Sequence, residues 1–180
     1  MSGEHRWHHA EALIVAESLL ASLSPACDRI ELAGSIRRGR PDVGDIELLC
    51  IPKAGDNAFY HDDLDEVLRA MMACQRLAPR PSKIGTHTYG PKNKLLVHVP
   101  SGIPVDVFST DAKNWGMAFV VRTGPAELNI RMMARFKSIG FAGHAYGGVT
   151  NRQGQEIECP DEETVFRLLG WPYMPPEQRR

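Results

Sequence analysis

The sequence is short of several features that mark whole classes of protein. None of its apolar stretches approaches the roughly 20 residues that a helix needs to span a bilayer, and its polar N-terminus lacks a signal-peptide pattern. The four cysteines are far apart and form no Cys-x-x-Cys pair, which indicates structural thiols in a reducing compartment. Internal repeats and low-complexity tracts are also missing. We therefore expect a cytoplasmic globular protein that does not contact membranes.

The chain also has no large excess of charge of either sign. The net charge is −1 at pH 7, so the molecule as a whole has no electrostatic attraction for nucleic acid. Basic residues nevertheless form three local clusters, which predicts a basic face; ordinary solvated surface is the alternative explanation of any one cluster. The clusters are Arg37, Arg38 and Arg40; Arg76, Arg80, Lys83, Lys92 and Lys94; and Arg122, Arg131, Arg135 and Lys137.

The hydrophobic pattern predicts an α+β protein with two domains. Helical spacing of apolar residues and capping signals predict helices over 5–23, 62–74, 115–121, 126–139 and, after an Asp161 cap, up to residue 169. Strand patterns cover 29–33, 45–51, 94–99 and 103–109, and the last two flank a Pro-Ser-Gly turn as a hairpin. The character of the chain changes near 110–114, which predicts one domain over 1–111 and another over 112–180.

Three acidic residues lie in or beside predicted strands. Asp45 and Glu47 are two residues apart and so project from one face, while Asp106 lies opposite the apolar residues of its own strand. If these strands are neighbours, the three carboxylates converge, although Asp106 taken alone could also be an edge residue. Two unit charges ~4 Å apart cost about 4 kcal/mol at an effective dielectric of 20. A hard divalent cation such as Mg²⁺ would remove that penalty.

A second motif is suited to phosphate. Gly34 and Ser35 follow a predicted strand and open a short helical turn, where free backbone N–H groups favour an anion. The Ser35 hydroxyl adds a donor, and the Arg38 guanidinium can grip phosphate oxygens in two bonds. Gly44, directly before Asp45, permits close approach of the backbone to a phosphate. The spacing of these residues predicts a nucleotide-binding site beside the carboxylates.

At this point the sequence resembles a known family. Segments 32–39 (LAGSIRRG) and 43–49 (VGDIELL) resemble the palm signature of the family X DNA polymerases, and 104–108 (PVDVF) is similar to the strand with the third metal ligand. Segment 122–129 resembles the thumb turn that contacts the incoming nucleotide, and 166–179 resembles the C-terminal helix and tail. The resemblance implies a polymerase beta-like nucleotidyltransferase palm, a mixed β-sheet with flanking helices, and a small α/β thumb.

The resemblance also implies an activity and a site. Asp45, Glu47 and Asp106 would be the catalytic ligands of two Mg²⁺ ions, with Mn²⁺ able to substitute. The enzyme would add deoxynucleotides to a primer 3′-hydroxyl on primer-template or gapped DNA, filling short gaps in DNA repair as a monomer. The implied nucleotide-binding residues are Gly34, Ser35, Arg38, Gly44, Thr123, Gly124 and Asn129, and the implied DNA-binding residues are Lys92, Lys94, Arg131 and Arg135.

The chain departs from the family pattern in several places. Glu47 stands where polymerases usually have aspartate, Val121-Arg122 replaces an aromatic pair, and Met133 lies about where a template-contacting arginine would be. The chain begins with the leading helix of the palm, so we expect no 5′-deoxyribose-phosphate lyase activity. Two alternatives stay open: a template-independent nucleotidyltransferase acting on RNA, protein or a small molecule, and a binding module without catalysis.

Overall fold

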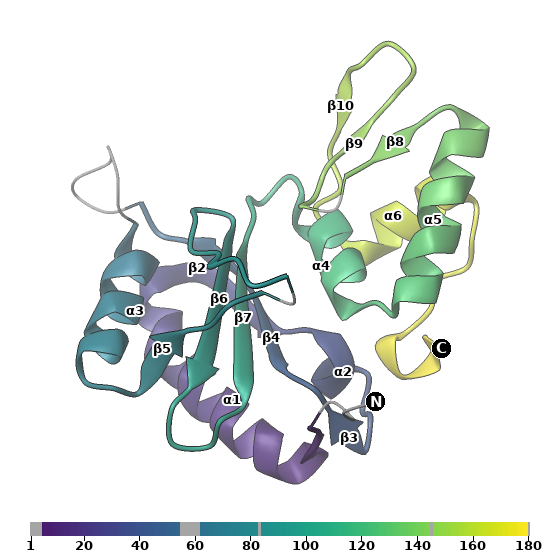
Figure 1. Ribbon diagram of the computed structural model, residues 1–180. Coiled ribbons are helices and arrows are strands. Elements are labelled where there is room, and N and C mark those ends of the chain that lie inside the picture. The colour runs from purple at the N-terminus through teal and green to yellow at the C-terminus, as the bar shows by residue number, and fades with distance from the viewer. Residues whose placement is uncertain (1–4, 55–61, 83, 145, 180) are drawn as a thin grey trace.

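We describe a computed structural model over residues 5–54, 62–82, 84–144 and 146–179. Its main feature is a five-stranded sheet with the order β2-β4-β7-β6-β5 (Figure 1). The strands are β2 Cys27–Leu32, β4 Ile46–Pro52, β5 Leu77–Pro79, β6 Asn93–His98 and β7 Pro104–Ser109. The central pair β4 and β7 is parallel and the other pairs are antiparallel. The sheet is therefore mixed, which confirms the predicted fold class and the predicted β6–β7 hairpin.

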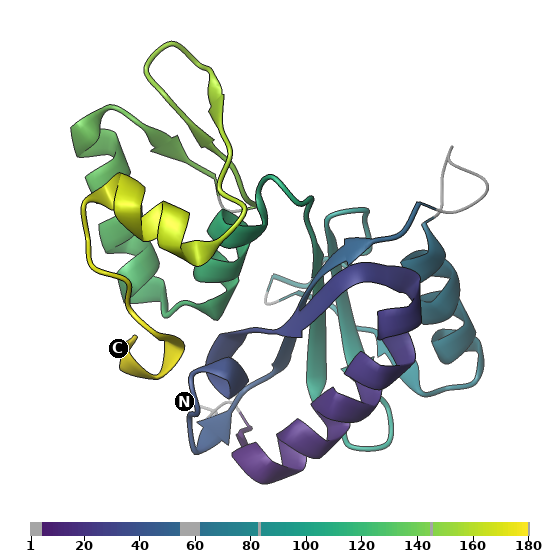
Figure 2. The same cartoon turned by 180° about the vertical axis from the view of Figure 1, so that it is seen from behind.

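One face of the sheet is covered by helices α1 (His9–Leu23) and α3 (Asp63–Ala73), as Figure 2 shows for α1. Strand residues alternate in direction, so Ile46, Leu48 and Cys50 of β4 face this layer. They join Val105 and Val107 of β7 in the largest apolar core, together with the buried stripe of both helices. The alternate positions of β4 and β7 therefore lie on the opposite face, which α1 and α3 leave uncovered.

That opposite face is partly covered by two further helices, α2 (Gly34–Arg37) and α4 (Trp115–Thr123). Trp115 and Phe119 of α4 are buried against Leu49 of β4 and Phe108 of β7. This small core fixes the start of the C-terminal part of the chain on the sheet. It leaves the beginning of β4 and β7 beside α2, where the acidic residues lie.

The C-terminal part forms its own apolar core. Helices α5 (Ala126–Ile139) and α6 (Glu162–Leu169) pack with α4 around Phe136 and Phe166. A small antiparallel sheet completes it, with strands β8 Ala142–Gly143, β9 Val149–Thr150 and β10 Glu156–Ile157. Two short 3₁₀ turns are also present. The first, η1 (Ser24–Ala26), follows α1. The second, η2 (Pro176–Gln178), lies near the end of the described chain, which returns toward α2 (Figure 2).

The first helix is shorter than predicted. Residues 5–8 do not belong to it, because β1 (Trp7–His8) pairs with β3 (Asp42–Val43) instead. The backbone N–H of His9, the first helical residue, donates to the carbonyl of Pro41 at 2.8 Å. This pairing anchors the N-terminal segment beside α2, which matters for the site below.

Candidate active site

The three acidic residues lie at one end of the uncovered sheet face. Glu47 of β4 and Asp106 of β7 are register partners on neighbouring parallel strands, and Asp45 comes immediately before β4. Because Glu47 and Asp106 alternate with the core residues on either side of them, both project away from α1 and α3. The fold thus places carboxylates on adjacent strands although the residues are far apart in sequence.

The site carries more negative charge than its surroundings stabilise. Burial raises the pKa of Glu47 to about 8, and the charges of Asp45 and Asp106 act in the same direction. Burial raises the pKa of Asp106 to about 6, with Asp45 again adding to the shift and Arg80 opposing it. Each carboxylate therefore disfavours ionisation of its neighbours, which is the situation that a bound cation relieves.

The oxygens of the three carboxylates do not surround a common point. Among the residues that the structure describes, no group of three His, Cys, Asp or Glu side chains is arranged to hold a metal ion. Asp106 Oδ1 is ion-paired with Nη2 of Arg80, which also donates from Nε to the Leu96 carbonyl at 3.0 Å. The Glu47 carboxylate packs against Gly34, where any added Cβ would collide with Oε2.

The donor set nevertheless fits a hard divalent cation. All three groups are carboxylates, the oxygen ligands that Mg²⁺ and Mn²⁺ prefer. Their mutual repulsion, expressed in the raised pKa values of Glu47 and Asp106, is what such an ion would remove.

An arginine-rich cavity of about 430 Å³ lies beside this site. It is lined by Arg6, Ser35, Arg38, Arg40, Pro41 and Asp42. Ser35 Oγ and Arg38 Nε are buried, and neither has a hydrogen-bond partner within the described part of the chain. Buried polar atoms in proteins are normally paired, so these two atoms point to a missing polar ligand. A phosphate group would satisfy both.

Arg6 and Arg40 were not among the site residues predicted from the sequence. Arg6 reaches the cavity because β1 pairs with β3, and its Nη2 donates to the Asp42 carbonyl at 2.7 Å. The nearest atom to a Cβ built on Gly44 is Nη1 of Arg6, at 3.9 Å, so Gly44 does border this region. No local motif marks Arg6, whereas Arg40 was visible only as a member of a basic cluster.

The predicted nucleotide contacts from the C-terminal part are engaged elsewhere. Thr123 is fully buried, and its Oγ1 accepts a hydrogen bond of 2.6 Å from Arg37 Nη1. Arg38 Nη1 donates to the Thr123 carbonyl and lies against Gly124. Asn129 Nδ2 donates to the Val121 carbonyl at 2.8 Å. In this arrangement Thr123 joins α4 to α2 and Asn129 Nδ2 joins α5 to α4, whereas Asn129 Oδ1 is buried without a hydrogen-bond partner in the described part of the chain.

The predicted DNA contacts divide into surface and buried residues. Lys92, Arg131 and Arg135 are exposed, although Arg135 Nε also donates to the Leu169 carbonyl at 3.0 Å. Lys94 is only 2% exposed, so the prediction that it contacts DNA is wrong. The reason is strand alternation: Lys94 lies two residues before Leu96 and projects to the same face, toward α1 and α3.

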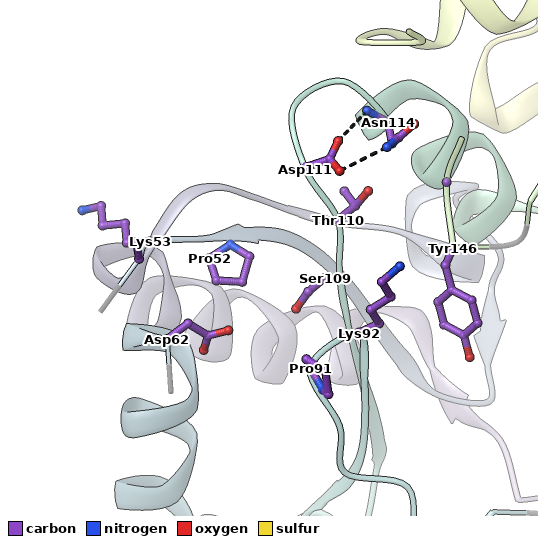
Figure 3. A pocket seen from close by; sticks show the side chains of 12 residues that line it. Pro52, Lys53, Asp62, Pro91, Lys92, Ser109, Thr110, Asp111, Asn114 and Tyr146 are labelled. Carbon is purple, nitrogen blue, oxygen red and sulfur yellow. Dashed lines mark hydrogen bonds between the residues drawn. The ribbon is translucent and has the colours of Figure 1, made fainter. Parts of the chain in front are cut away.

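Lys92 lines a second cavity, of about 380 Å³, at the carboxyl ends of β4 and β7. Figure 3 shows it together with Tyr146 and with Asn114, whose Nδ2 donates to Asp111 at 3.1 Å. The cavity is lined by lysines as well as by acidic residues, so its charge does not favour an anion.

A buried ion-pair network connects α2 to the C-terminal part. Glu162 is 5% exposed, and its carboxylate accepts hydrogen bonds from Arg37 Nη1 at 2.7 Å and Nη2 at 2.8 Å. Arg179 Nη1 donates to it at 2.8 Å and the Tyr173 hydroxyl at 3.2 Å. We call these four residues the Glu162 network. It was not predicted, because no local pattern links residues so far apart.

Comparison of this sequence with known proteins shows what the chain is similar to. Residues 118–180 match the family model described as the DNA polymerase beta thumb. DNA polymerase lambda from Rattus norvegicus is 25% identical to this chain over 158 residues, which is 81% of the chain and 28% of the relative. The chain thus spans little more than a quarter of the length of that relative.

Residues 118–180 are therefore similar to the thumb of DNA polymerase beta, and we call residues 118–180 the thumb from here on. The chain is thus similar to the family X DNA polymerases, which confirms the resemblance found in its motifs. No helix in the described ranges is long and apolar enough to cross a membrane.

Proposed function

We propose that this chain is a DNA polymerase of the family X type, which adds deoxynucleotides to a primer 3′-hydroxyl. The observation that carries the proposal is the pairing of Glu47 and Asp106 on parallel strands beside a cavity with an unpartnered Ser35 hydroxyl. Acidic ligands next to an arginine-lined cavity suit a reaction in which a triphosphate is held and its charge neutralised. We also propose that it fills short gaps in DNA repair.

The carboxylates would hold the metal ions. Asp45 and Glu47 would bind both of two Mg²⁺ or Mn²⁺ ions, and Asp106 would bind the one beside the primer 3′-hydroxyl. When bound, such ions supply Lewis-acid stabilisation of the attacking and leaving oxygens of an in-line displacement. The oxygens of this chain that carry out the binding are all carboxylate oxygens, which suits hard cations.

The arginines would hold the triphosphate. Ser35 Oγ and Arg38 Nε are the unpartnered donors, and Arg6 and Arg40 line the same cavity. Guanidinium groups bind phosphate oxygens in pairs of charge-assisted hydrogen bonds. These groups would orient the α-phosphate for attack by the 3′-hydroxyl and stabilise the charge that develops on the departing pyrophosphate.

DNA would bind through the exposed basic residues of the sheet and the thumb. Lys92, Arg131 and Arg135 are candidates because they are exposed, whereas Lys94 is not. Three phosphate contacts would give a slope of about −2.7 in a plot of log affinity against log salt concentration. An affinity that does not change with salt concentration would exclude DNA as the partner of these basic residues.

A template-independent nucleotidyltransferase is the second candidate. It is favoured by the engaged hydroxyl of Thr123, one of the residues through which the thumb would contact the base pair being formed. Without such contacts, selection of the nucleotide would depend less on a template. The acceptor could then be RNA, a protein hydroxyl or a small molecule.

Primer extension separates these possibilities. The assay compares a gapped duplex with a bare single strand, using deoxy- and ribonucleotides in Mg²⁺ and in Mn²⁺. We expect template-directed addition on the gapped duplex, and a loss on the order of a thousandfold in Asp106→Asn. The control is Asp28→Asn, an exposed aspartate of β2, which should retain full activity. Equal addition with and without template would favour the second candidate, and unchanged activity of Asp106→Asn would exclude both.

A further inference from the structure

One wall of the arginine-rich cavity comes from the N-terminal segment 6–9, which is remote in sequence from the other walls. Trp7 of β1 pairs with Val43 of β3 and packs against the largest apolar core, in which Val43 is fully buried. The preceding residue, Arg6, is exposed and lines the cavity. The pairing of β1 with β3 therefore fixes the N-terminal segment beside the cavity.

Three consecutive carbonyls of the loop after α2 contact this segment. His9 Nδ1 lies 2.9 Å from the Arg40 carbonyl oxygen, and the His9 backbone N–H donates to the Pro41 carbonyl at 2.8 Å. Arg6 Nη2 donates to the Asp42 carbonyl at 2.7 Å. Arg40, Pro41 and Asp42 themselves line the cavity. The N-terminal segment therefore holds the backbone of the loop that forms another wall.

The backbone of Arg40 is fixed from both sides. Its N–H donates to the Ser35 carbonyl at 3.1 Å, and its carbonyl lies against the ring nitrogen of His9. A carbonyl oxygen only accepts, so Nδ1 of His9 carries the proton in this hydrogen bond. Arg40 is exposed and its side chain is long and rotatable, so its backbone decides which phosphate positions the guanidinium can reach.

We propose that His9 is a positioning residue, which holds the Arg40 peptide so that the Arg40 guanidinium reaches a phosphate group in the cavity. The inference rests on the proposed function, because it takes this cavity as the triphosphate site. The buried and unpartnered Ser35 Oγ and Arg38 Nε independently mark the cavity as a place for a polar ligand. A side chain oriented before binding loses less entropy when the phosphate arrives. Loss of the His9 hydrogen bond should therefore weaken binding of the anion.

The first measurement tests the hydrogen bond without any ligand. The ring nitrogens of His9 are observed by nuclear magnetic resonance at about pH 9, where an imidazole ring is neutral and one nitrogen carries the proton. We expect the proton on Nδ1. A proton on Nε2 would overturn the proposal, because Nδ1 could then not donate to the Arg40 carbonyl.

The second measurement tests the positioning. Inorganic tripolyphosphate is titrated into the protein by calorimetry in EDTA, without nucleotide or DNA. We expect His9→Leu to bind it roughly fivefold more weakly than the wild type, about the effect of one hydrogen bond. In His9→Asn the amide nitrogen can take the place of Nδ1, so the affinity should stay near the wild type. The control His98→Leu removes a histidine whose Nδ1 lies 2.8 Å from Ser101 Oγ, and should leave the affinity unchanged.

A double variant separates positioning from a general loosening of the structure. If His9 acts through Arg40, His9→Leu should cost much less affinity beside Arg40→Gln than alone, and equal losses would overturn the proposal. In steady-state kinetics His9→Leu should raise the KM for the deoxynucleotide and leave kcat near the wild type. If His9→Leu does not fold, His9→Gln replaces it. Its amide lies one methylene further out, so we expect a loss of affinity in the same direction.

The measurements separate failure of the inference from failure of the proposed function. If the wild type binds tripolyphosphate and His9→Leu binds it as tightly as His98→Leu does, the positioning role of His9 is overturned while the anion site stands. If the wild type does not bind tripolyphosphate, the cavity is not a triphosphate site, and both the nucleotide site of the proposed function and the role of His9 are overturned.

Discussion

Glu162 is the residue whose replacement should most clearly reveal how the thumb is held on the sheet. Its carboxylate is the shared acceptor of Arg37 from α2 and Arg179 from the end of the described chain. We predict that Glu162→Gln destabilises the protein strongly at neutral pH, because it removes the one negative charge between two guanidinium groups of the Glu162 network.

The magnitude follows from burial. The Glu162 side chain is 6% exposed, and the side chains of Arg37 and Arg179 are 19% and 0% exposed. Removing one partner of a buried ion pair costs about 3–5 kcal/mol, because the remaining charge is left without compensation. Glutamine keeps one acceptor oxygen, so we take the lower end, about 3 kcal/mol. In a chain of this size that lowers the melting temperature by about 6–12 °C.

The effect should depend on pH in a definite direction. Burial acts to raise the pKa of Glu162, but the hydrogen bonds from Arg37 and Arg179 outweigh it and hold that pKa below the ordinary value of 4.5. Because the pKa in the folded state is the lower one, the stabilisation is fully present above the unfolded value. It is lost as the pH falls through the folded value. The difference between wild type and Glu162→Gln should therefore shrink steadily below about pH 4.5.

Urea unfolding at neutral and acidic pH measures this difference. The matched control is Glu31→Gln, whose carboxylate pairs with Arg29 while the two side chains are 40% and 46% exposed. An exposed pair of this kind contributes about 0–1 kcal/mol. The reasoning is refuted if Glu162→Gln loses no more stability than Glu31→Gln at pH 7, or if its deficit persists undiminished in acid.

Three other substitutions test separate parts of the structure. Gly116→Ala should cost about 3 kcal/mol in thermal unfolding, because its Cβ would collide with the backbone of Asp161 at the start of α6; a gain from helix propensity would contradict this close approach. Lys94→Met should leave DNA affinity unchanged in a fluorescence titration and change stability by less than about 1.5 kcal/mol, since the side chain is buried. Arg6→Gln should raise the KM for the triphosphate more than it lowers kcat in steady-state kinetics, and an unchanged KM would remove Arg6 from the site.

Much of the fold could be predicted from the sequence because local patterns determine it. Apolar spacing gave α5 with both ends correct, and the carboxylate of Asp161 caps α6 by accepting from the Thr164 N–H at 2.7 Å, as predicted. The β6–β7 hairpin followed from two alternating segments around a short turn. These signals act within a few residues of each other, so a single sequence contains them.

The partners of the charged side chains could not be predicted in the same way. Arg80 and Asp106 are 26 residues apart, and Arg37 and Glu162 are 125 apart, so only the folded chain brings them together. The burial of Lys94 is different, because its alternation with Leu96 is a local pattern that the sequence contains. The boundary between the two predicted domains at residue 111 stays a prediction.

The charges at the site bear on how nucleotide and metal bind together. Arginines from three different parts of the chain oppose the raised pKa values of Glu47 and Asp106: Arg38 after α2, Arg80 after β5 and Arg122 in α4. Three carboxylates and three guanidinium groups balance in formal charge, although burial and mutual repulsion still raise the pKa of Glu47 and of Asp106. A triphosphate bound alone would add negative charge to the site, and divalent cations bound alone would add positive charge. Either ligand alone would therefore leave the site with an excess of charge. Two divalent cations offset the charge of the triphosphate, so binding of nucleotide and of metal should strengthen each other.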